Sequence, residues 1–294
     1  QELCTPIIFG SSKVASFHRK AMGIEDFSFN VIENPSKANN KKANLINCWK
    51  EEAKITLGEN TPEGGRFAFK SLEAATNALQ KGEVDVLITA PINKQNIQSD
   101  SFQFPGHTEY LAAKGKGDAL MLMLSESMRI GVVTGHLPLE QVSANISQEK
   151  VLEKLRLLNN SLKQDFGIRK PKIAVLGLNP HAGDQGVLGK EEDDIISPAL
   201  QKAKEENIVS FGPYPADSFF GSDKLGVFDG ILAMYHDQGL IPFKTLAFGK
   251  GVNFTSGLSF VRTSPDHGTA FEIAGENKAN EQSFREAVFT ACDI

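Results

Sequence analysis

Residues 129–181 read RIGVVTGHLPLEQVSANISQEKVLEKLRLLNNSLKQDFGIRKPKIAVLGLNPH, and this stretch decides the fold. Near its two ends lie short apolar runs, Arg129–Thr134 and Ile173–Leu178, which predict buried β-strands. Between them, Ser147 is a favourable helix N-cap and Gly167 a favourable helix end. The apolar positions in between recur at helical spacing and predict one buried face: Val151, Leu152, Leu155, Leu158, Leu162 and Phe166. The stretch therefore predicts a strand–helix–strand unit.

The same alternation of apolar runs and amphipathic segments continues on both sides of this unit. Further strands are predicted at residues 6–9, 27–32, 53–57, 84–90, 119–124 and 230–234, and further helices at 12–22, 67–79, 191–207 and 281–291. Such alternation is typical of an α/β fold with a largely parallel sheet. The closely spaced strands at 119–134 predict an antiparallel addition. The Asn- and Lys-rich segment 34–50 is expected to be an exposed excursion.

Composition indicates one or two globular domains. The chain has 294 residues, of which 40% are hydrophobic and 23% charged, and its net charge is −5. This charge disfavours nucleic acid or an anionic membrane as a partner, since both require a basic face. No apolar run approaches the roughly 20 residues of a membrane helix. The cysteines Cys4, Cys48 and Cys292 are dispersed and form no CxxC pair, so we expect a reducing, cytoplasmic location.

Three histidines follow directly on predicted buried strands: His136, His181 and His236. In open α/β sheets the ligand site lies beyond the carboxyl ends of the strands, where side chains from distant segments can converge. Neutral imidazole is a common ligand of zinc and similar ions, and three protein ligands with one open position describe a catalytic metal site. The spacing therefore predicts a metal site.

Local hydrogen bonding is the simpler interpretation for any one of these histidines. Three of them at successive strand ends favour a shared cation instead. Asp184, Asp217 and Asp237 lie nearby in the sequence. They are candidates either for a further ligand or for accepting the ring N–H groups.

Basic residues in loop-like stretches predict an anion site. Lys94 follows the predicted strand 84–90, Lys244 follows MYHDQGLIPF, and Arg262 precedes the turn of His267. Side chains of this kind bind phosphate or carboxylate. Lys250, in FGKGVN, is equally well interpreted as a solvated surface residue. Neither GxGxxG after a strand nor a P-loop motif occurs, so an ordinary Rossmann dinucleotide site and a P-loop are both excluded.

Longer motifs then carry a family resemblance, which runs from about Val84 to the C-terminus. These motifs are TGHLPL (134–139), LNPHAGD (178–184), MYHDQGL (234–240), FGKGVN (248–253) and VRTSPDHGTAFEIAG (261–275). In order and spacing they resemble the 4-hydroxythreonine-4-phosphate dehydrogenase, or PdxA, family. The resemblance implies an α/β fold with two lobes like that of isocitrate and isopropylmalate dehydrogenases, with mostly parallel sheets and a central cleft. It implies a nucleotide-side lobe of residues 1–110 with 240–294, and a metal- and dimer-side lobe of residues 111–239.

The resemblance also implies a role for individual residues. The implied ligands of a divalent metal, zinc in the first place and magnesium or cobalt otherwise, are His136, His181 and His236. The implied substrate contacts are His107, Thr108, Lys244, Asn253 and Arg262. The residues similar to the superfamily's adenosine-binding loop, which would hold NAD or NADP, are His267, Gly268, Thr269 and Ala270 with Gly275. Asp217 matches an acidic residue beside the metal, and either Lys244 or Asp217 is the candidate proton acceptor.

The implied reaction is oxidation of 4-phosphohydroxy-L-threonine, with decarboxylation to 3-amino-2-oxopropyl phosphate, in pyridoxal 5'-phosphate biosynthesis. The family is homodimeric, and its active site uses residues from both subunits. One alternative is a paralogue that oxidises another phosphorylated hydroxy acid, such as threonate or erythronate 4-phosphate. Two others are a three-histidine zinc hydrolase and a non-catalytic protein that binds small anions on an acetyltransferase-like fold.

The resemblance is incomplete at the beginning of the sequence. The family opens with a strand and a loop of the type TxGDPAGIGPE. This chain opens with QELCTPIIFGSS, which resembles the segment after that opening. We therefore expect the first strand and its loop to be absent from this sequence.

Overall fold

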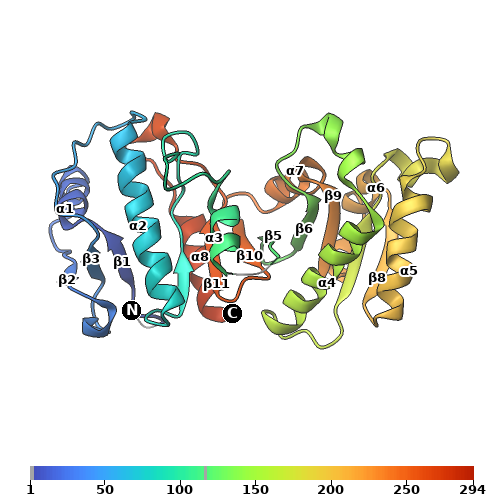
Figure 1. Ribbon diagram of the computed structural model, residues 1–294, viewed down its shortest axis with the longest axis horizontal. Coiled ribbons are helices and arrows are strands. Elements are labelled where there is room, and N and C mark those ends of the chain that lie inside the picture. The colour runs from blue at the N-terminus through green and yellow to red at the C-terminus, as the bar shows by residue number, and fades with distance from the viewer. Residues whose placement is uncertain (1–2, 116–117) are drawn as a thin grey trace. The chain divides into compact units, whose positions relative to one another are not determined.

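The computed structural model describes residues 3–115 and 118–294. The chain forms two compact units, one of Gln1–Lys116 with Ser259–Asp293 and the other of Gly117–Leu258 (Figure 1). Both are built from strands and helices, as predicted. The chain returns from the second unit to the first after Leu258, whereas this boundary is predicted after residue 239. The reason is that β10 (Val252–Ser256) pairs with β5 (Leu120–Leu124) of the second unit.

The second unit contains a mixed sheet with the strand order β10–β5–β6–β9–β7–β8. Its parallel strands are β6 (Arg129–Thr134), β9 (Gly230–Tyr235), β7 (Lys172–Leu176) and β8 (Val209–Tyr214). β5 runs antiparallel to both β6 and β10. The predicted parallel sheet and its antiparallel addition are therefore confirmed. β6, β7 and β9 are buried along most of their length, as expected for parallel strands covered on both faces.

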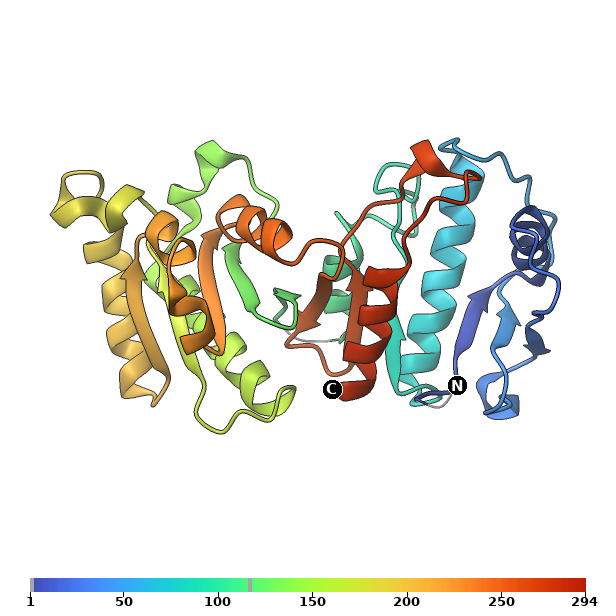
Figure 2. The same ribbon diagram turned by 180° about the vertical axis from the view of Figure 1, so that it is seen from behind.

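Helices cover both faces of this sheet. α4 (Gln148–Gln164) and α5 (Ser197–Glu205) lie on the face seen in Figure 1, and α6 (Ala216–Phe220) and α7 (His236–Leu246) lie on the other, seen in Figure 2. Successive side chains of a strand point to opposite faces of the sheet, and along β9 they meet α4 on one face and α7 on the other. A Cβ at Gly230 would lie 2.9 Å from Leu162 of α4. Ala233, on the opposite face, has its Cβ 3.2 Å from where a Cβ of Gly239 in α7 would be.

α4 begins where it is predicted and has most of its predicted buried face, but it ends at Gln164, before the predicted end at Gly167. The Ser147 side chain accepts a hydrogen bond from the Lys150 N–H at 3.2 Å and so caps the first turn. Most of the predicted apolar positions are buried, whereas Phe166, beyond the helix end, is only half-buried. Within residues 3–115 and 118–294, no helix has both the length and the apolarity needed to cross a membrane.

The first unit contains two groups of strands. β1 (Ile7–Gly10), β3 (Asn44–Asn47) and β2 (Asn30–Ile32) form a parallel sheet in that order, and β4 (Val86–Ile88) pairs in parallel with β11 (Val261–Pro265). α2 (Pro62–Gln80) packs against β1 and β4, and α8 (Gln282–Asp293) packs against β4 and β11. α1 (Ser12–Ala21) and α3 (His107–Gly115) also belong to this unit. The helices predicted at 12–22, 67–79 and 281–291 are confirmed.

The segment 34–50 is not the exposed excursion that is predicted, because it contains β3. Asn44 and Leu45 in this strand are fully buried. The Asn44 side chain satisfies its polar atoms locally: its Oδ1 accepts from Asn30 Nδ2 and from the Asn39 N–H, both at 2.9 Å, and its Nδ2 donates to the carbonyls of Pro6, Asn39 and Lys42. Because both polar atoms of the buried Asn44 amide have hydrogen-bond partners, a polar segment can contain a strand of the core.

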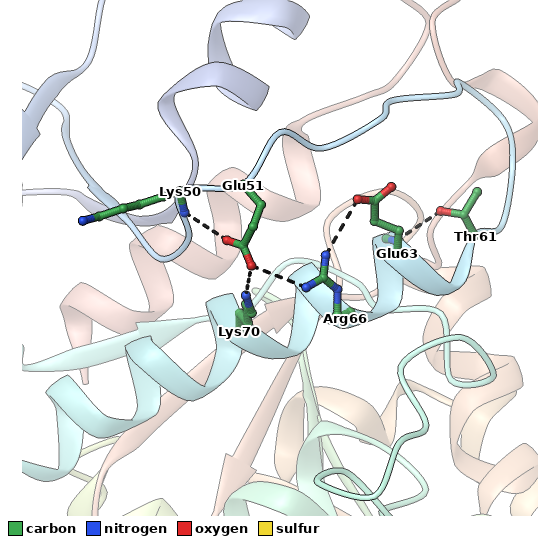
Figure 3. A network of polar contacts seen from close by, with 7 residues as sticks. Lys50, Glu51, Thr61, Glu63, Arg66 and Lys70 are labelled. Carbon is green, nitrogen blue, oxygen red and sulfur yellow. Dashed lines mark hydrogen bonds and ion pairs between the residues drawn. The ribbon is translucent and has the colours of Figure 1, made fainter.

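The strand predicted at 53–57 is absent, and the chain there is irregular. Just before it, side chains tie the segment to α2 (Figure 3). Lys70 Nζ donates to Glu51 Oε1 at 2.7 Å, and Arg66 Nη1 lies 3.5 Å from the same oxygen. The hydrogen bond from Lys70 is the largest cause that lowers the pKa of Glu51 to about 2. Because these ion pairs are on the surface, they fix the position of the segment on α2 but contribute little to the free energy of unfolding.

Candidate active site

The strands that carry His136 and His236 end side by side. β6 and β9 are parallel neighbours with Thr134 opposite Tyr235. The Thr134 hydroxyl also donates to the Met234 carbonyl at 2.8 Å. The two histidines follow these strand ends, and their ring centroids are 5.6 Å apart. The structure thus brings together two of the three predicted metal ligands, which we call the histidine pair.

His236 is held by the helix that it begins. Its Nδ1–H donates to Asp237 Oδ1 at 2.7 Å, because an ionised carboxylate can only accept. The lone pair of the ring is therefore on Nε2, the nitrogen that a metal would bind. α7 packs closely on the sheet, since a Cβ at Gly239 would lie only 3.0 Å from Ile130 Cγ2. This close packing fixes the first turn of α7 and with it His236.

His181 follows β7, which pairs with the other side of β9, so it lies at the same sheet edge. Its loop has an unusual backbone, because five successive residues from His181 to Gln185 have φ between 44° and 81°. This left-handed conformation costs about 1 kcal/mol or more for each residue other than Gly. His181 is exposed. Among residues 3–115 and 118–294, no group of three or more His, Cys, Asp or Glu side chains is placed to hold a metal, so His181, where its side chain lies in this structure, does not complete a three-ligand site.

The histidine pair has the donor chemistry that zinc favours. Two imidazoles project from adjacent strand ends, and a carboxylate orients one of them. Magnesium prefers oxygen ligands and is less well suited to this set. The pair therefore fits a divalent cation of the zinc type, with further positions left for other ligands.

The other predicted residues of the second unit lie on three different elements. Lys244 is exposed in the last turn of α7. Asp217 is exposed on α6, which contacts the loop of His181. Asn253 is half-buried in β10, opposite Met123 of β5.

Arg262 is a buried cation in the first unit. It lies in β11 opposite Leu87 of β4, and only 3% of it is exposed. Its Nε and Nη2 donate to Thr89 Oγ1 at 3.1 and 2.7 Å. Burial lowers the pKa of the guanidinium to about 10, against the opposing effect of Glu109, so Arg262 stays charged at neutral pH. A buried guanidinium held in this way is suited to recognising an anion.

His107, the first residue of α3, lies close to this charge. Burial lowers the pKa of His107 to about 3, and the charges of Arg262 and Lys94 lower it further, while Glu109 opposes them. The imidazole is therefore neutral at physiological pH. A Cβ at Gly106 would lie 3.7 Å from Lys94 Cε and 3.4 Å from Glu109 Oε2, so both side chains flank the start of α3.

We call Arg262, Lys94, His107 and Thr89 the Arg262 cluster. It lies at the N-terminus of α3, where the backbone N–H groups of the first turn and the helix dipole favour an anion. Thr108, the next predicted substrate contact, is the second residue of the same helix and is half-buried. The predicted residues His107, Thr108 and Arg262 thus belong to one neighbourhood.

The residues predicted to bind adenosine follow β11 in the same unit. His267, Gly268 and Thr269 are exposed, and His267 Nδ1 bonds the Gly268 carbonyl at 3.0 Å. Ala270 has a φ of 48°. Gly275 has a φ of 85°, and a Cβ there would lie 2.7 Å from Leu57 Cδ1. The loop is therefore packed against the segment at Leu57, and a side chain at 275 would disturb it.

The sequence does not reveal Thr89 of the Arg262 cluster or Glu109, whose charge acts on Arg262 and His107. Thr89 belongs to the apolar run VDVLITA and resembles an ordinary strand residue. Glu109 in PGHTEY resembles an acidic residue of a helix first turn. The usable signal for Thr89 is its position at the carboxyl end of a predicted buried strand, where ligand sites lie.

The chain consists of two α/β units. One unit carries an imidazole pair at the ends of its parallel strands, and the other carries a buried cationic cluster. Together these features define an α/β enzyme with a cation-binding and an anion-binding group of side chains. The crystal structure of isocitrate dehydrogenase from Methylococcus capsulatus shares this fold, with a TM-score of 0.51 at 11% identity, over 97% of this chain and 84% of that chain.

The chain belongs to the PdxA family, described as pyridoxal phosphate biosynthetic protein PdxA, whose sequence model matches residues 2–291. The 4-hydroxythreonine-4-phosphate dehydrogenase of Bacteroides thetaiotaomicron is 50% identical over 100% of this chain and 81% of the relative. The crystal structure of the enzyme of that name from Klebsiella pneumoniae has a TM-score of 0.85 at 31% identity, over 98% of this chain and 88% of that chain. The one from Burkholderia phymatum has a TM-score of 0.82 at 33% identity, over 99% and 89%. These matches confirm the predicted family and fold.

Proposed function

We propose that the chain is an NAD(P)-dependent dehydrogenase that oxidises 4-phosphohydroxy-L-threonine, with decarboxylation to 3-amino-2-oxopropyl phosphate, in pyridoxal 5'-phosphate biosynthesis. The observation that carries the proposal is the match over essentially the whole chain to relatives with this activity in their names, at up to 50% identity. The site chemistry supports it, because a buried guanidinium suits a phosphate and an imidazole pair suits a cation.

In this proposal the Arg262 cluster binds the phosphate of the substrate. Arg262 keeps its charge in a buried position, and Lys94 adds a second positive charge nearby. The N–H groups at the start of α3 provide further donors. His107 is neutral, so it can donate to or accept from a polar substrate group, and Thr108, Lys244 and Asn253 are the other proposed substrate contacts.

In this proposal the divalent metal, zinc by preference, would be held by His136, His181 and His236, and the side chain of His181 would complete the site when the metal binds. When bound, it supplies Lewis acid chemistry to the hydroxyl that is oxidised and to the carbonyl that results. Asp237 keeps His236 in the tautomer whose Nε2 can coordinate. The left-handed loop presents His181 at the same sheet edge as the pair.

The oxidation releases the hydroxyl proton, and Lys244 and Asp217 are the two proposed acceptors. Both side chains are exposed, so either can pass a proton on to water. The loop of His267, Gly268, Thr269, Ala270 and Gly275 binds the adenosine part of NAD or NADP in this proposal. That cofactor would supply the hydride acceptor, and the residues of this loop would position it.

We also propose that the chain works as a cytoplasmic homodimer with an active site shared between subunits. The support for a dimer is a set of exposed apolar side chains near the predicted ligands. Ile241, Leu246 and Phe248, on and after α7, are 62%, 54% and 90% exposed, and Val187, in the loop after His181, is 76% exposed. Exposed apolar residues on neighbouring elements are typical of an interface.

The direct test is turnover of 4-phosphohydroxy-L-threonine, followed by the absorbance of the reduced nicotinamide with NAD and with NADP. We expect activity that a chelator abolishes and that added zinc, cobalt or magnesium restores. Threonate 4-phosphate and erythronate 4-phosphate serve as comparison substrates. Higher kcat/KM with either of them, or activity unaffected by the chelator, contradicts the proposal.

A further inference from the structure

A buried carboxylate lies under the loop that carries His181. Glu192 is only 3% exposed. Its Oε1 accepts hydrogen bonds from the backbone N–H groups of Leu178 and Asn179, both at 2.7 Å, and its Oε2 accepts from Asn179 Nδ2 at 3.0 Å. A buried carboxylate is costly unless donors compensate its charge, and three donors of the segment just after β7 do so here.

The same contacts join the loops of the three predicted metal ligands. Asn179 Nδ2 also donates to Glu191 Oε2 at 2.8 Å, and Glu191 Oε1 accepts from Ser143 Oγ at 2.7 Å, in the segment that follows His136. From α7, Gln238 Nε2 donates to the Gly177 carbonyl at 2.6 Å while Gln238 Oε1 accepts from the Met234 N–H at 2.7 Å. The segments after β6 and β7 and the helix after β9 are thus linked by side chains outside the proposed ligand set.

The loop of His181 is wrapped closely around Glu192. A Cβ at Gly177 would lie 3.1 Å from Glu192 Oε1, and a Cβ at Gly183 would lie 2.6 Å from Glu192 Oε2. The left-handed residues His181 to Gln185 lie in this wrapped segment. Strained backbone of this kind persists only where the surroundings impose it. The Glu192 hydrogen bonds are buried contacts at the beginning of this segment, next to its left-handed residues.

We propose that Glu192, through Asn179 and the N–H groups of residues 178 and 179, is a positioning residue that fixes the backbone of the loop from which His181 binds the divalent cation. The inference rests on the proposed function, in which His181 is a ligand. Glu192 itself does not touch substrate or cation in this role. Its removal therefore weakens cation binding without removing any ligand.

The test measures the zinc affinity of the full chain by competition with a chromophoric chelator. Four variants are compared with the wild type: Glu192→Gln, Asn179→Ala, His181→Ala and the control Asp193→Asn, which neutralises an exposed carboxylate next to Glu192. We expect Glu192→Gln and Asn179→Ala to bind zinc about 10- to 100-fold more weakly, as is usual when a residue that orients a ligand is lost. Asp193→Asn is expected to match the wild type. At saturating zinc, kcat is expected to recover in Glu192→Gln and not in His181→Ala.

The outcomes separate this inference from the proposed function. If His181→Ala loses zinc while the folded Glu192→Gln and Asn179→Ala keep wild-type affinity, the inference fails and the ligand assignment stands. If the wild type binds no zinc, or His181→Ala binds it as well as the wild type does, both fail. Circular dichroism and thermal unfolding report whether each variant is folded. If Glu192→Gln does not fold, the milder Asn179→Ala decides.

Discussion

Arg262 provides the clearest test at the scale of a single residue. Its guanidinium is buried, charged and held by Thr89, so we expect it to contact the phosphate of the substrate. A hydrogen bond to a charged group contributes about 1.5–3 kcal/mol, roughly 10- to 150-fold in kcat/KM. Arg262→Ala should therefore lower kcat/KM by about this factor, mainly through KM. Steady-state kinetics with the phosphorylated substrate measure the effect.

Two comparisons make that result specific. Arg169→Ala removes an exposed arginine of the second unit and should leave the kinetics unchanged. Thr89→Val keeps the charge of Arg262 but removes the oxygen that orients it, so a smaller rise in KM is expected. An equal loss of kcat/KM for phosphorylated and dephosphorylated substrates would exclude a phosphate contact at Arg262.

His107 makes the stability of the first unit depend on pH. Its pKa is about 3 in the folded chain and 6.5 ordinarily, so between these values the unfolded state binds more protons. The free energy of unfolding must then fall as the pH drops below about 6.5, by up to about 1.4 kcal/mol for each pH unit. His107→Gln should flatten this dependence. Urea unfolding followed by the fluorescence of Trp49, the single tryptophan, measures it.

The useful window for this measurement is about pH 5 to pH 7. Glu51 has a lowered pKa of about 2, so its stabilising contribution is lost only as the pH falls below its ordinary value of 4.5. Lys70→Met, which removes the partner of Glu51, should therefore leave the slope in this window unchanged. A slope in His107→Gln as steep as that of the wild type contradicts the assignment to His107.

Individual site residues differ in how far the sequence reveals them. His136 and His236 are predictable because each follows a strongly apolar run, and parallel neighbours end at one edge. The left-handed backbone at His181 is not predictable, because its loop packs around Glu192, a residue with no local signal. Thr89 is hidden in the same way, since its role depends on a partner 173 residues away.

At the scale of an element, α2 depends on one glycine. Gly65 is buried in this helix, and a Cβ there would lie 1.9 Å from the Asn96 carbonyl oxygen. Alanine is favoured over glycine in a helix by about 1 kcal/mol, but overpacking costs about 1–3 kcal/mol or more where the backbone must move. Gly65→Ala should therefore lower the free energy of unfolding. Gly64→Ala is the matched comparison.

Gly64→Ala should cost less because its Cβ would meet only side-chain atoms, Thr61 Oγ1 at 3.2 Å and Asn96 Nδ2 at 3.8 Å. Both substitutions gain the same helix propensity, so their difference isolates the close approach of α2 to Asn96. Denaturant unfolding of both variants measures that difference. A Gly65→Ala variant at least as stable as Gly64→Ala would show that the segment at Asn96 yields easily.

Elements are predictable where their periodicity is strong. α4 matches its predicted face because Ser147 and the apolar positions all indicate the same helix. β3 is hidden because a buried Asn44, satisfied by neighbouring polar groups, replaces the apolar residue expected there. The predicted strand at 53–57 fails for the opposite reason: its apolar residues have no neighbouring strand to pair with, and Leu57 packs against Gly275 instead.

At the scale of the whole molecule, the proposed homodimer makes activity depend on assembly. Ile241 is 62% exposed on the helix that begins with His236, and Phe248 is 90% exposed just after that helix. A carboxylate introduced in a dimer interface must be desolvated without a partner, and central interface residues are worth about 2 kcal/mol or more, about 30-fold in Kd. Phe248→Asp and Ile241→Asp should therefore dissociate the dimer and lower activity together.

Sedimentation equilibrium and turnover, measured over the same range of protein concentration, connect the two effects. Val31→Asp is the matched control, because Val31 is 53% exposed on β2 of the first unit, in a sheet that carries none of the predicted metal ligands. The control should sediment as a dimer with full activity. If Phe248→Asp and Ile241→Asp sediment as monomers and keep full activity, the active site is complete within one chain. If the wild type itself is an active monomer, the exposed apolar residues need another explanation.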